Sequence, residues 1–162
     1  HMFSDSYSRR PVVFASFGAL IAWVVRPVSV ETSLSKVVVH KDPNCGCCQK
    51  WADHLTAAGF SVEVIAPPDL ATIKAKLGVT DDIKSCHTAE VGGYVIEGHV
   101  PADAILRLLR EKPAALGLAV PGMPAGSPGM EGSTAESYNV LLFGSEGRSI
   151  FARYKGSGKM PL

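Results

Sequence analysis

Patterns typical of β-strands alternate with patterns typical of helices along residues 36–154. A β-branched run at 36–40 comes first, and apolar side chains then recur at 48–55 with the spacing of one helix face. A second strand pattern at 61–65 alternates polar and apolar residues, and Pro67-Pro68-Asp69 opens a second helix. This order predicts an α/β domain that begins β-α-β-α.

The middle of the chain predicts a short hairpin followed by a third helix. An extended segment at 93–96 is expected to turn at Glu97-Gly98 and to return through His99-Val100. Pro101 then opens a helix whose apolar side chains recur on one face. In this arrangement Cys86 lies in the loop that precedes the hairpin.

The last third of the chain predicts a loop, a hairpin and a tail. Residues 111–137 are rich in Pro, Gly and Ala and predict a long loop, a feature that is commonly functional in compact domains. A C-terminal β-hairpin is expected to pair 138–143 with 149–154, and a flexible tail is expected over 156–162. The whole order predicts a thioredoxin-like central sheet flanked by helices over residues 36–155.

The first 35 residues predict an export signal or an N-terminal anchor rather than part of this domain. His1-Met2 is typical of a cloning remnant, and Arg9-Arg10 precedes an apolar or small stretch from Val12 to Val25. This stretch is too short to span a bilayer comfortably and fits the apolar core of an export signal. Export by the Sec or twin-arginine route would place the domain in the periplasm. Contact with a membrane is expected only through this segment, if it stays uncleaved.

Composition limits the class of partner. The chain has 162 residues, 46% of them hydrophobic, which predicts one globular domain. Its 16 Lys and Arg residues nearly balance 15 Asp and Glu residues, for a net charge of +1. Because nucleic-acid binding requires a concentration of basic side chains, nucleic acid is not an expected partner.

The four cysteines are the residues most indicative of function. Cys45, Cys47 and Cys48 fall within four positions, and the fourth is Cys86. Cysteines so few and so clustered indicate site chemistry rather than a disulfide scaffold. Cys45 and Cys48 have the C-x-x-C spacing at an expected helix start, where the helix dipole favours a thiolate. One hypothesis is a thiol–disulfide oxidoreductase in which Cys45 attacks and Cys48 resolves.

The same cysteines also suit a soft metal ion. Three thiolates can converge in a turn, and the loop with Cys86 is expected to pass over the helix start. Thiolates select Cu(I), Zn(II) or iron–sulfur clusters. Zinc sites usually combine two C-x-x-C pairs, whereas this chain has a dense C-x-C-C and one further Cys, which favours copper. The prediction is a copper site of Cys45, Cys47, Cys48 and Cys86, with a structural disulfide such as Cys48–Cys86 as the alternative.

Two methionines and a histidine extend this candidate site. Met123 and Met130 lie in near-repeated Pro-Gly-Met turns of the long loop, outside any apolar periodicity. A thioether on such a turn is a soft copper ligand, although methionine also caps hydrophobic cores. His87 follows Cys86 and is expected either to bind the metal or to donate a hydrogen bond to one of its ligands. His99 is expected mainly to form a hydrogen bond within the hairpin or to cap the next helix.

Several longer motifs run through the same region: Pro43–Cys48 with Trp51 and His54-Leu55, then 85–89, 97–102, 117–124 and 126–131. With these motifs, residues 36–154 resemble the CopG-like family of exported copper-resistance proteins. The resemblance implies a periplasmic, thioredoxin-like protein that binds copper through its cysteines and interconverts Cu(I) and Cu(II). It implies copper ions as partners, together with other periplasmic copper-handling proteins or a thiol reductant.

Overall fold

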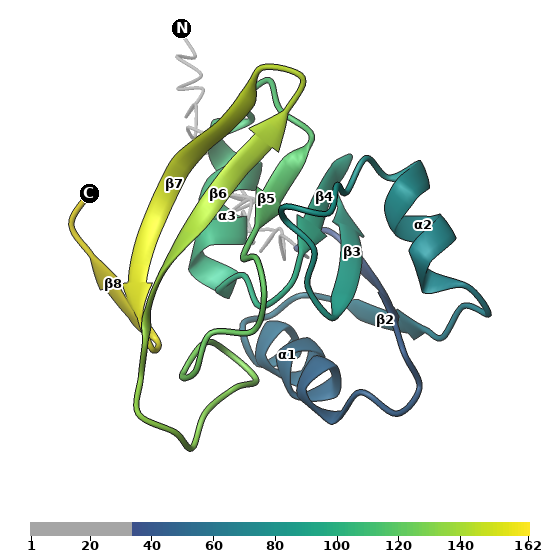
Figure 1. Ribbon diagram of the computed structural model, residues 1–162, viewed down its shortest axis with the longest axis horizontal. Helices are drawn as coiled ribbons and strands as arrows, with labels where there is room; N and C mark the ends of the chain where they lie inside the picture. Colours follow the sequence, from purple (N-terminus) through teal and green to yellow (C-terminus); the bar gives the residue numbers. More distant parts are fainter. Residues whose placement is uncertain (1–33) are drawn as a thin grey trace, which may run out of the picture. The chain divides into compact units, whose positions relative to one another are not determined.

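The computed structural model describes residues 34–162, so the predicted export segment up to residue 33 lies outside the described residues (Figure 1). The described part is an α/β arrangement of eight strands and three helices, and the predicted fold class is confirmed at this level. In chain order the elements are β1 (Val37–Lys41), α1 (Gly46–Ala57), β2 (Val62–Ile65), α2 (Leu70–Lys76), β3 (His87–Val91), β4 (Tyr94–Glu97), α3 (Ala102–Glu111), β5 (Gly117–Ala119), β6 (Ser137–Gly144), β7 (Gly147–Lys155) and β8 (Gly158–Met160).

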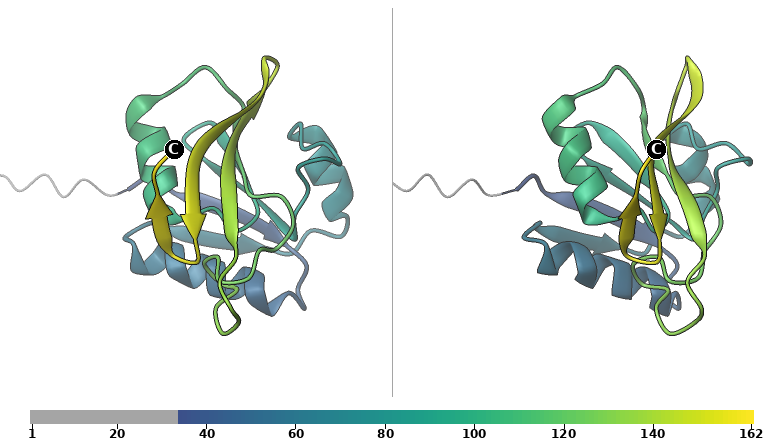
Figure 2. Two further views of the ribbon diagram at one scale, coloured as in Figure 1. Left: turned by 60° about the vertical axis from the view of Figure 1, so that its left-hand side comes forward. Right: turned by 90° about the vertical axis from the view of Figure 1, so that its left-hand side faces the viewer.

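All eight strands form one mixed sheet in the order β2-β1-β3-β4-β5-β6-β7-β8. The pairs β1–β2 and β4–β5 are parallel, because a helix connects the two strands of each pair, and the other neighbours are antiparallel. The C-terminal strands β6, β7 and β8 lie side by side at one edge (Figure 2). Within residues 34–162, no helix is long and apolar enough to cross a membrane.

Side chains that alternate along each strand give the sheet two different faces. Ile96 of β4 packs in one hydrophobic cluster with Trp51 of α1 and Ile105 of α3, so these two helices cover the same face. Val95, the preceding residue of β4, packs instead with Ile83, which follows α2. The cysteine-bearing helix α1 and α2 therefore lie on opposite faces of the sheet.

The middle hairpin differs from the sequence-based expectation. Its turn is Gly92-Gly93 between β3 and β4, rather than Glu97-Gly98, and both turn glycines have positive φ (55° and 82°). A two-residue turn of this type needs positive φ at both positions, which glycine adopts without steric cost. As a result His87 begins a strand, and His99 follows the hairpin instead of belonging to it.

Two further segments are more ordered than the sequence predicts. Gly117–Ala119 of the predicted long loop forms β5, which pairs with β4 and β6. Gly158–Met160 of the predicted flexible tail forms β8, which pairs with β7. Both strands have three residues, too few to show a recognisable alternation.

Candidate metal centre

Residues 42–48, called here the cysteine turn, comprise the connection from β1 to α1 and the first three residues of α1. The Cys45 N–H donates to the Asp42 carbonyl (3.1 Å), and the Asn44 N–H donates to the Asp42 side chain (2.8 Å). Cys45 is the N-cap of α1, and its sulfur accepts the Cys48 N–H at 3.3 Å. The turn is thus held by contacts within a few residues, and it presents its sulfurs at the positive end of the helix dipole.

The four cysteine sulfurs lie within 4.8 Å of one another, as the sequence predicts. Cys45 and Cys48 form a disulfide, while Cys47 and Cys86 are free thiols. The Cys47 sulfur lies 3.4 Å from that of Cys45 and 4.0 Å from that of Cys86. Cys48 is fully buried and the other three are partly exposed. The alternative disulfide Cys48–Cys86 is not formed.

Residues 85–88, called here the Cys86 segment, are held by a buried carboxylate. Glu97 accepts the Ser85 N–H (2.7 Å) and the Thr88 hydroxyl (2.5 Å), and it pairs with Lys74 of α2 at 2.5 Å. Glu97 is fully buried and Lys74 nearly so. Burial raises the pKa of Glu97, and the Lys74 ammonium opposes that rise. This network fixes the backbone on both sides of Cys86.

Two imidazoles contact the Cys86 sulfur. It lies 3.3 Å from His87 Nδ1 and 3.1 Å from His99 Nε2, and these three residues form a second group with the geometry to hold a metal ion. His99 Nδ1 donates to the Pro128 carbonyl at 2.7 Å. His87 lies against Trp51, with ring centroids 4.3 Å apart, and its Nε2 has no hydrogen-bond partner within the described part of the chain.

Burial sets the protonation states of these side chains. It lowers the pKa of His87 well below the ordinary value and also lowers the pKa of His99, so both imidazoles are neutral near pH 7. Burial, together with the neighbouring Cys47, raises the pKa of the Cys86 thiol to about 11. Cys86 is therefore a protonated thiol in the absence of a metal ion.

The loop 120–136 crosses the start of α1. A Cβ added at Gly129 would lie 2.7 Å from the Cys47 carbonyl oxygen and 3.0 Å from the Trp51 backbone nitrogen, and Gly129 has a φ of 92°. Only glycine fits this close approach without strain. The Ser85 hydroxyl donates to the Gly122 carbonyl at 2.5 Å, which ties the other end of the loop to the Cys86 segment.

The chain is similar to one protein family and to two solved structures. Residues 83–130 match a family described as a protein of unknown function, DUF411, and this span contains Cys86, both imidazoles and both loop methionines. Two solved structures, reported as copper resistance protein CopG form 2 and form 1, each share 45% sequence identity with the chain at a TM-score of 0.71. The first match covers 75% of this chain and 98% of the other chain, and the second covers 76% and 99%.

The chain belongs to the CopG-like copper resistance family. No curated protein matches it.

The predicted residues of this CopG-like chain fall into three groups. The four cysteines and His87 lie together. Met123 and Met130 lie on the loop whose backbone contacts the site, but Met123 is 52% exposed, and ligation by either thioether stays a prediction. His99 joins the group although the sequence favours a capping role for it. Its neighbours Cys86 and Pro128 are 13 and 29 residues away, so no local spacing reveals the contact.

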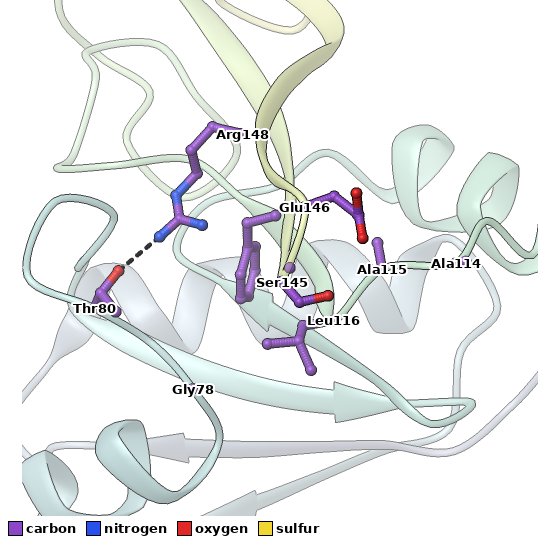
Figure 3. Close-up of a pocket in the computed structure, with 10 residues that line it drawn as sticks. Gly78, Thr80, Ala114, Ala115, Leu116, Ser145, Glu146 and Arg148 are labelled. Carbon is purple, nitrogen blue, oxygen red and sulfur yellow. Dashed lines mark hydrogen bonds between the residues drawn. The ribbon is translucent and has the colours of Figure 1, made fainter.

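A separate cavity of about 590 Å³ lies beside the β6–β7 hairpin (Figure 3). Arg148 crosses its edge and donates to the Thr80 hydroxyl at 2.7 Å, while Leu116 and Phe143 supply apolar wall. Neither the cysteine turn nor the Cys86 segment contributes to its lining.

Proposed function

We propose that this protein binds Cu(I) through Cys45, Cys47, Cys48 and Cys86 as part of bacterial copper resistance in the periplasm. The observation that carries the proposal is the convergence of four sulfurs within 4.8 Å. Thiolates are soft ligands that favour Cu(I), and a cluster this dense offers sulfurs able to bridge more than one ion. Two solved structures named for copper resistance, at 45% identity, support copper over other soft metals.

The Cys45–Cys48 disulfide supports a redox role at the same site. When two thiolates become a disulfide they release two electrons, which reduce two Cu(II) ions to two Cu(I) ions. A thiol reductant then restores the pair by thiol–disulfide exchange. In this proposal the protein interconverts the copper oxidation states, and Cys47 and Cys86 retain the metal while the pair is oxidised.

A thiol–disulfide oxidoreductase is the second candidate function, and the disulfide between the two C-x-x-C residues favours it. In this alternative the domain acts as a thioredoxin-like enzyme, Cys45 attacks and Cys48 resolves. The two functions differ in what they require of Cys47. Copper binding needs this sulfur, whereas exchange between Cys45 and Cys48 does not.

Location and partners follow from the sequence rather than from the described residues. Export into the periplasm would supply an oxidising compartment, in which free thiols persist only when they are paired, metal-bound or kept reduced. We propose copper ions as the bound species, with a thiol reductant or other periplasmic copper-handling proteins as partners.

An anaerobic Cu(I) titration of the reduced full chain tests the proposal, with a chelator as competitor and with copper and free thiols counted on one sample. We expect at least one tightly bound copper ion with all four thiols shielded. Cys47→Ser and Cys86→Ser should each lower the copper bound. Weak binding with four reactive thiols would contradict the proposal and favour the oxidoreductase, and full stoichiometry in both variants would contradict the four-cysteine site.

The methionine prediction has its own matched control. Met123→Leu and Met130→Leu remove thioethers from the loop at the site, and Met160→Leu removes one from β8 at the sheet edge. If the loop thioethers bind copper, the first two variants lower Cu(I) affinity and the third does not. Equal affinities in all three would show that neither loop methionine binds copper.

A further inference from the structure

We infer that His54 is a pH-sensitive cap that joins α1 to α3, formed when the imidazole is neutral and lost when it is protonated. His54 lies in the last turn of α1, and its Nε2 accepts the N–H of Ala102, the first residue of α3, at 3.1 Å. His54 belongs to neither group of candidate metal ligands, so this cap does not depend on the proposed copper function.

The N-terminus of α3 takes its cap from another helix. The first N–H groups of a helix have no partner within the helix, and the side chain of the N-cap residue usually accepts one of them. Here the N-cap residue is Pro101, whose side chain has no acceptor atom. The Ala102 N–H is accepted instead by His54, which is 48 residues away in the sequence. His54 thus substitutes for a local cap.

The hydrogen bond requires a neutral imidazole. A backbone N–H only donates, so the His54 Nε2 that accepts it carries no proton. Protonation of His54 places an N–H at Nε2 and removes the acceptor. The new charge also lies at the N-terminus of α3, where the positive end of the helix dipole repels a cation. The dipole of α1 acts in the opposite sense, because His54 lies near the C-terminus of that helix.

Burial and nearby charges determine when His54 takes up a proton. Burial has the largest influence, and it lowers the pKa of His54 from its ordinary value of 6.5. The carboxylates of Glu131 in the loop 120–136 and of Asp103 in α3 act in the opposite sense. On α1 itself, Lys50 precedes His54 by four residues and is a like charge on the same helix face. The imidazole is therefore neutral, and the cap is formed, near pH 7.

Both carboxylates are held by contacts of their own. Asp103 accepts the Tyr154 hydroxyl at 2.8 Å, and Glu131 accepts the Gly129 N–H with its two oxygens at 2.9 and 3.0 Å. Although burial would raise the pKa of Glu131, hydrogen bonds from backbone N–H groups lower it, so this carboxylate is ionised over the pH range just below neutral. Once His54 is protonated, Glu131 attracts it in place of the Ala102 N–H.

A second contact from α1 limits the extent of the change. Trp51, one turn before His54, donates its indole N–H to the Val100 carbonyl at 2.8 Å. This N–H is a donor at any pH in the physiological range. The connection from β4 to α3 is thus held at two points, of which only the one at Ala102 depends on pH. Acid should release the first turn of α3 while Val100 stays in place.

NMR of the full chain between about pH 8 and about pH 4.5 is the direct test. We expect the His54 ring nitrogens to titrate below the ordinary histidine value, and the Ala102 amide resonance to shift with the same midpoint. His54→Gln retains an acceptor but does not titrate, so the Ala102 shift should disappear in that variant. An Ala102 amide that still shifts in His54→Gln, or that stays fixed while the wild-type His54 ring titrates, would overturn the inference.

Urea denaturation is the second test. The folded state binds the His54 proton less tightly than the unfolded state, so the contribution of the cap is fully present above about pH 6.5 and is lost as the pH falls through the lowered pKa. Between about pH 7.5 and about pH 5 the urea midpoint of the wild type should fall by about 0.5 M more than that of His54→Gln.

His40→Gln is the matched control for this measurement, because His40 lies on β1 and contacts Glu90 instead of a helix terminus. This variant should keep the pH-dependent loss that His54→Gln removes. A difference between the wild type and His54→Gln that does not change with pH would contradict a titrating cap and would leave His54 with a packing role only.

Discussion

The cysteine turn and the Cys86 segment carry the same functional group but are built in different ways. Hydrogen bonds within residues 42–48 and the start of α1 hold the cysteine turn. The Cys86 segment instead depends on Glu97 of β4 and Lys74 of α2, which come from the other face of the sheet. A substitution that removes one local hydrogen bond is therefore expected to affect the cysteine turn only slightly. The Cys86 segment should instead be sensitive to substitutions of Glu97 and Lys74, which are distant in sequence.

Removal of the buried carboxylate should give the largest effect. Glu97→Ala leaves Lys74 buried without a counter-charge and Ser85 without its acceptor, and we expect a loss of about 3–5 kcal/mol in the free energy of unfolding. Urea denaturation measures it. Glu90→Ala on the same hairpin removes only a partly exposed pair with His40 and should cost about 1 kcal/mol or less.

A double variant separates stability from positioning. Lys74→Met with Glu97→Leu removes both buried charges and should restore much of the stability. Because the Ser85 N–H still lacks its acceptor, Cu(I) affinity should stay below that of the wild type. Wild-type affinity in this variant would show that the Cys86 segment does not need the network.

Gly129→Ala tests the loop that contacts both regions. Alanine at a positive φ costs about 1–3 kcal/mol, and here its Cβ would also displace the Cys47 carbonyl or the His99 ring. Gly132→Ala is the matched control, because Gly132 has a φ of 104° with open space around its Cβ position. Both variants should lose stability, but only Gly129→Ala should also lose Cu(I) affinity, as measured by chelator competition.

Alkaline pH should act on the Cys86 segment. The pKa of the Cys86 thiol is raised from 9.0 to about 11, so the folded state holds this proton more tightly than the unfolded state. Its contribution to stability is fully present below pH 9 and is lost as the pH rises through about 11. We expect a modest decrease, since solvent screens a partly exposed thiol. The decrease should be absent in Cys86→Ser, and its persistence there would assign it to another group.

The smallest effect is expected from the local anchor of the cysteine turn. Asp42→Ala removes one exposed hydrogen bond to the Asn44 N–H and should cost about 0.5–1 kcal/mol. The Cys45–Cys48 disulfide should still form, as a thiol count would show. Asp53→Ala removes a comparable exposed contact on α1 and is the control. A loss as large as that of Glu97→Ala would contradict the difference between the two regions.

The elements predicted correctly are those whose pattern is local and long. The cysteine turn, α1, α3 and the β6–β7 hairpin have clear periodicity or turn residues. The sequence misplaces the middle hairpin because Glu97 is a charged residue next to a glycine, which is typical of an exposed turn. It is instead fully buried, and its counter-charge Lys74 is 23 residues away. No local pattern indicates such a pair.

The candidate site likewise has contacts that the sequence predicts and contacts that it does not. The sequence predicts the convergence of the cysteines, because three of them lie in one turn. It does not predict that His99 contacts Cys86, because that contact depends on where β4 ends and on the loop at Pro128. Residue type and spacing indicate which chemistry is available, whereas the protonated nitrogen of an imidazole follows only from its partners in the folded chain.

The complete burial of Cys48 gives the disulfide a direction of reaction. An attacking thiolate must approach one sulfur along the S–S axis, and Cys45 is partly exposed whereas Cys48 is fully buried. In thiol–disulfide exchange at this site, the mixed disulfide would therefore form on Cys45, and the electron pair would depart with the Cys48 sulfur, inside the protein. The Cys48 thiolate would be released at the first turn of α1 rather than into solvent. A reductant would then react at the protein surface, whereas the thiolate that it generates would lie in the buried part of the site.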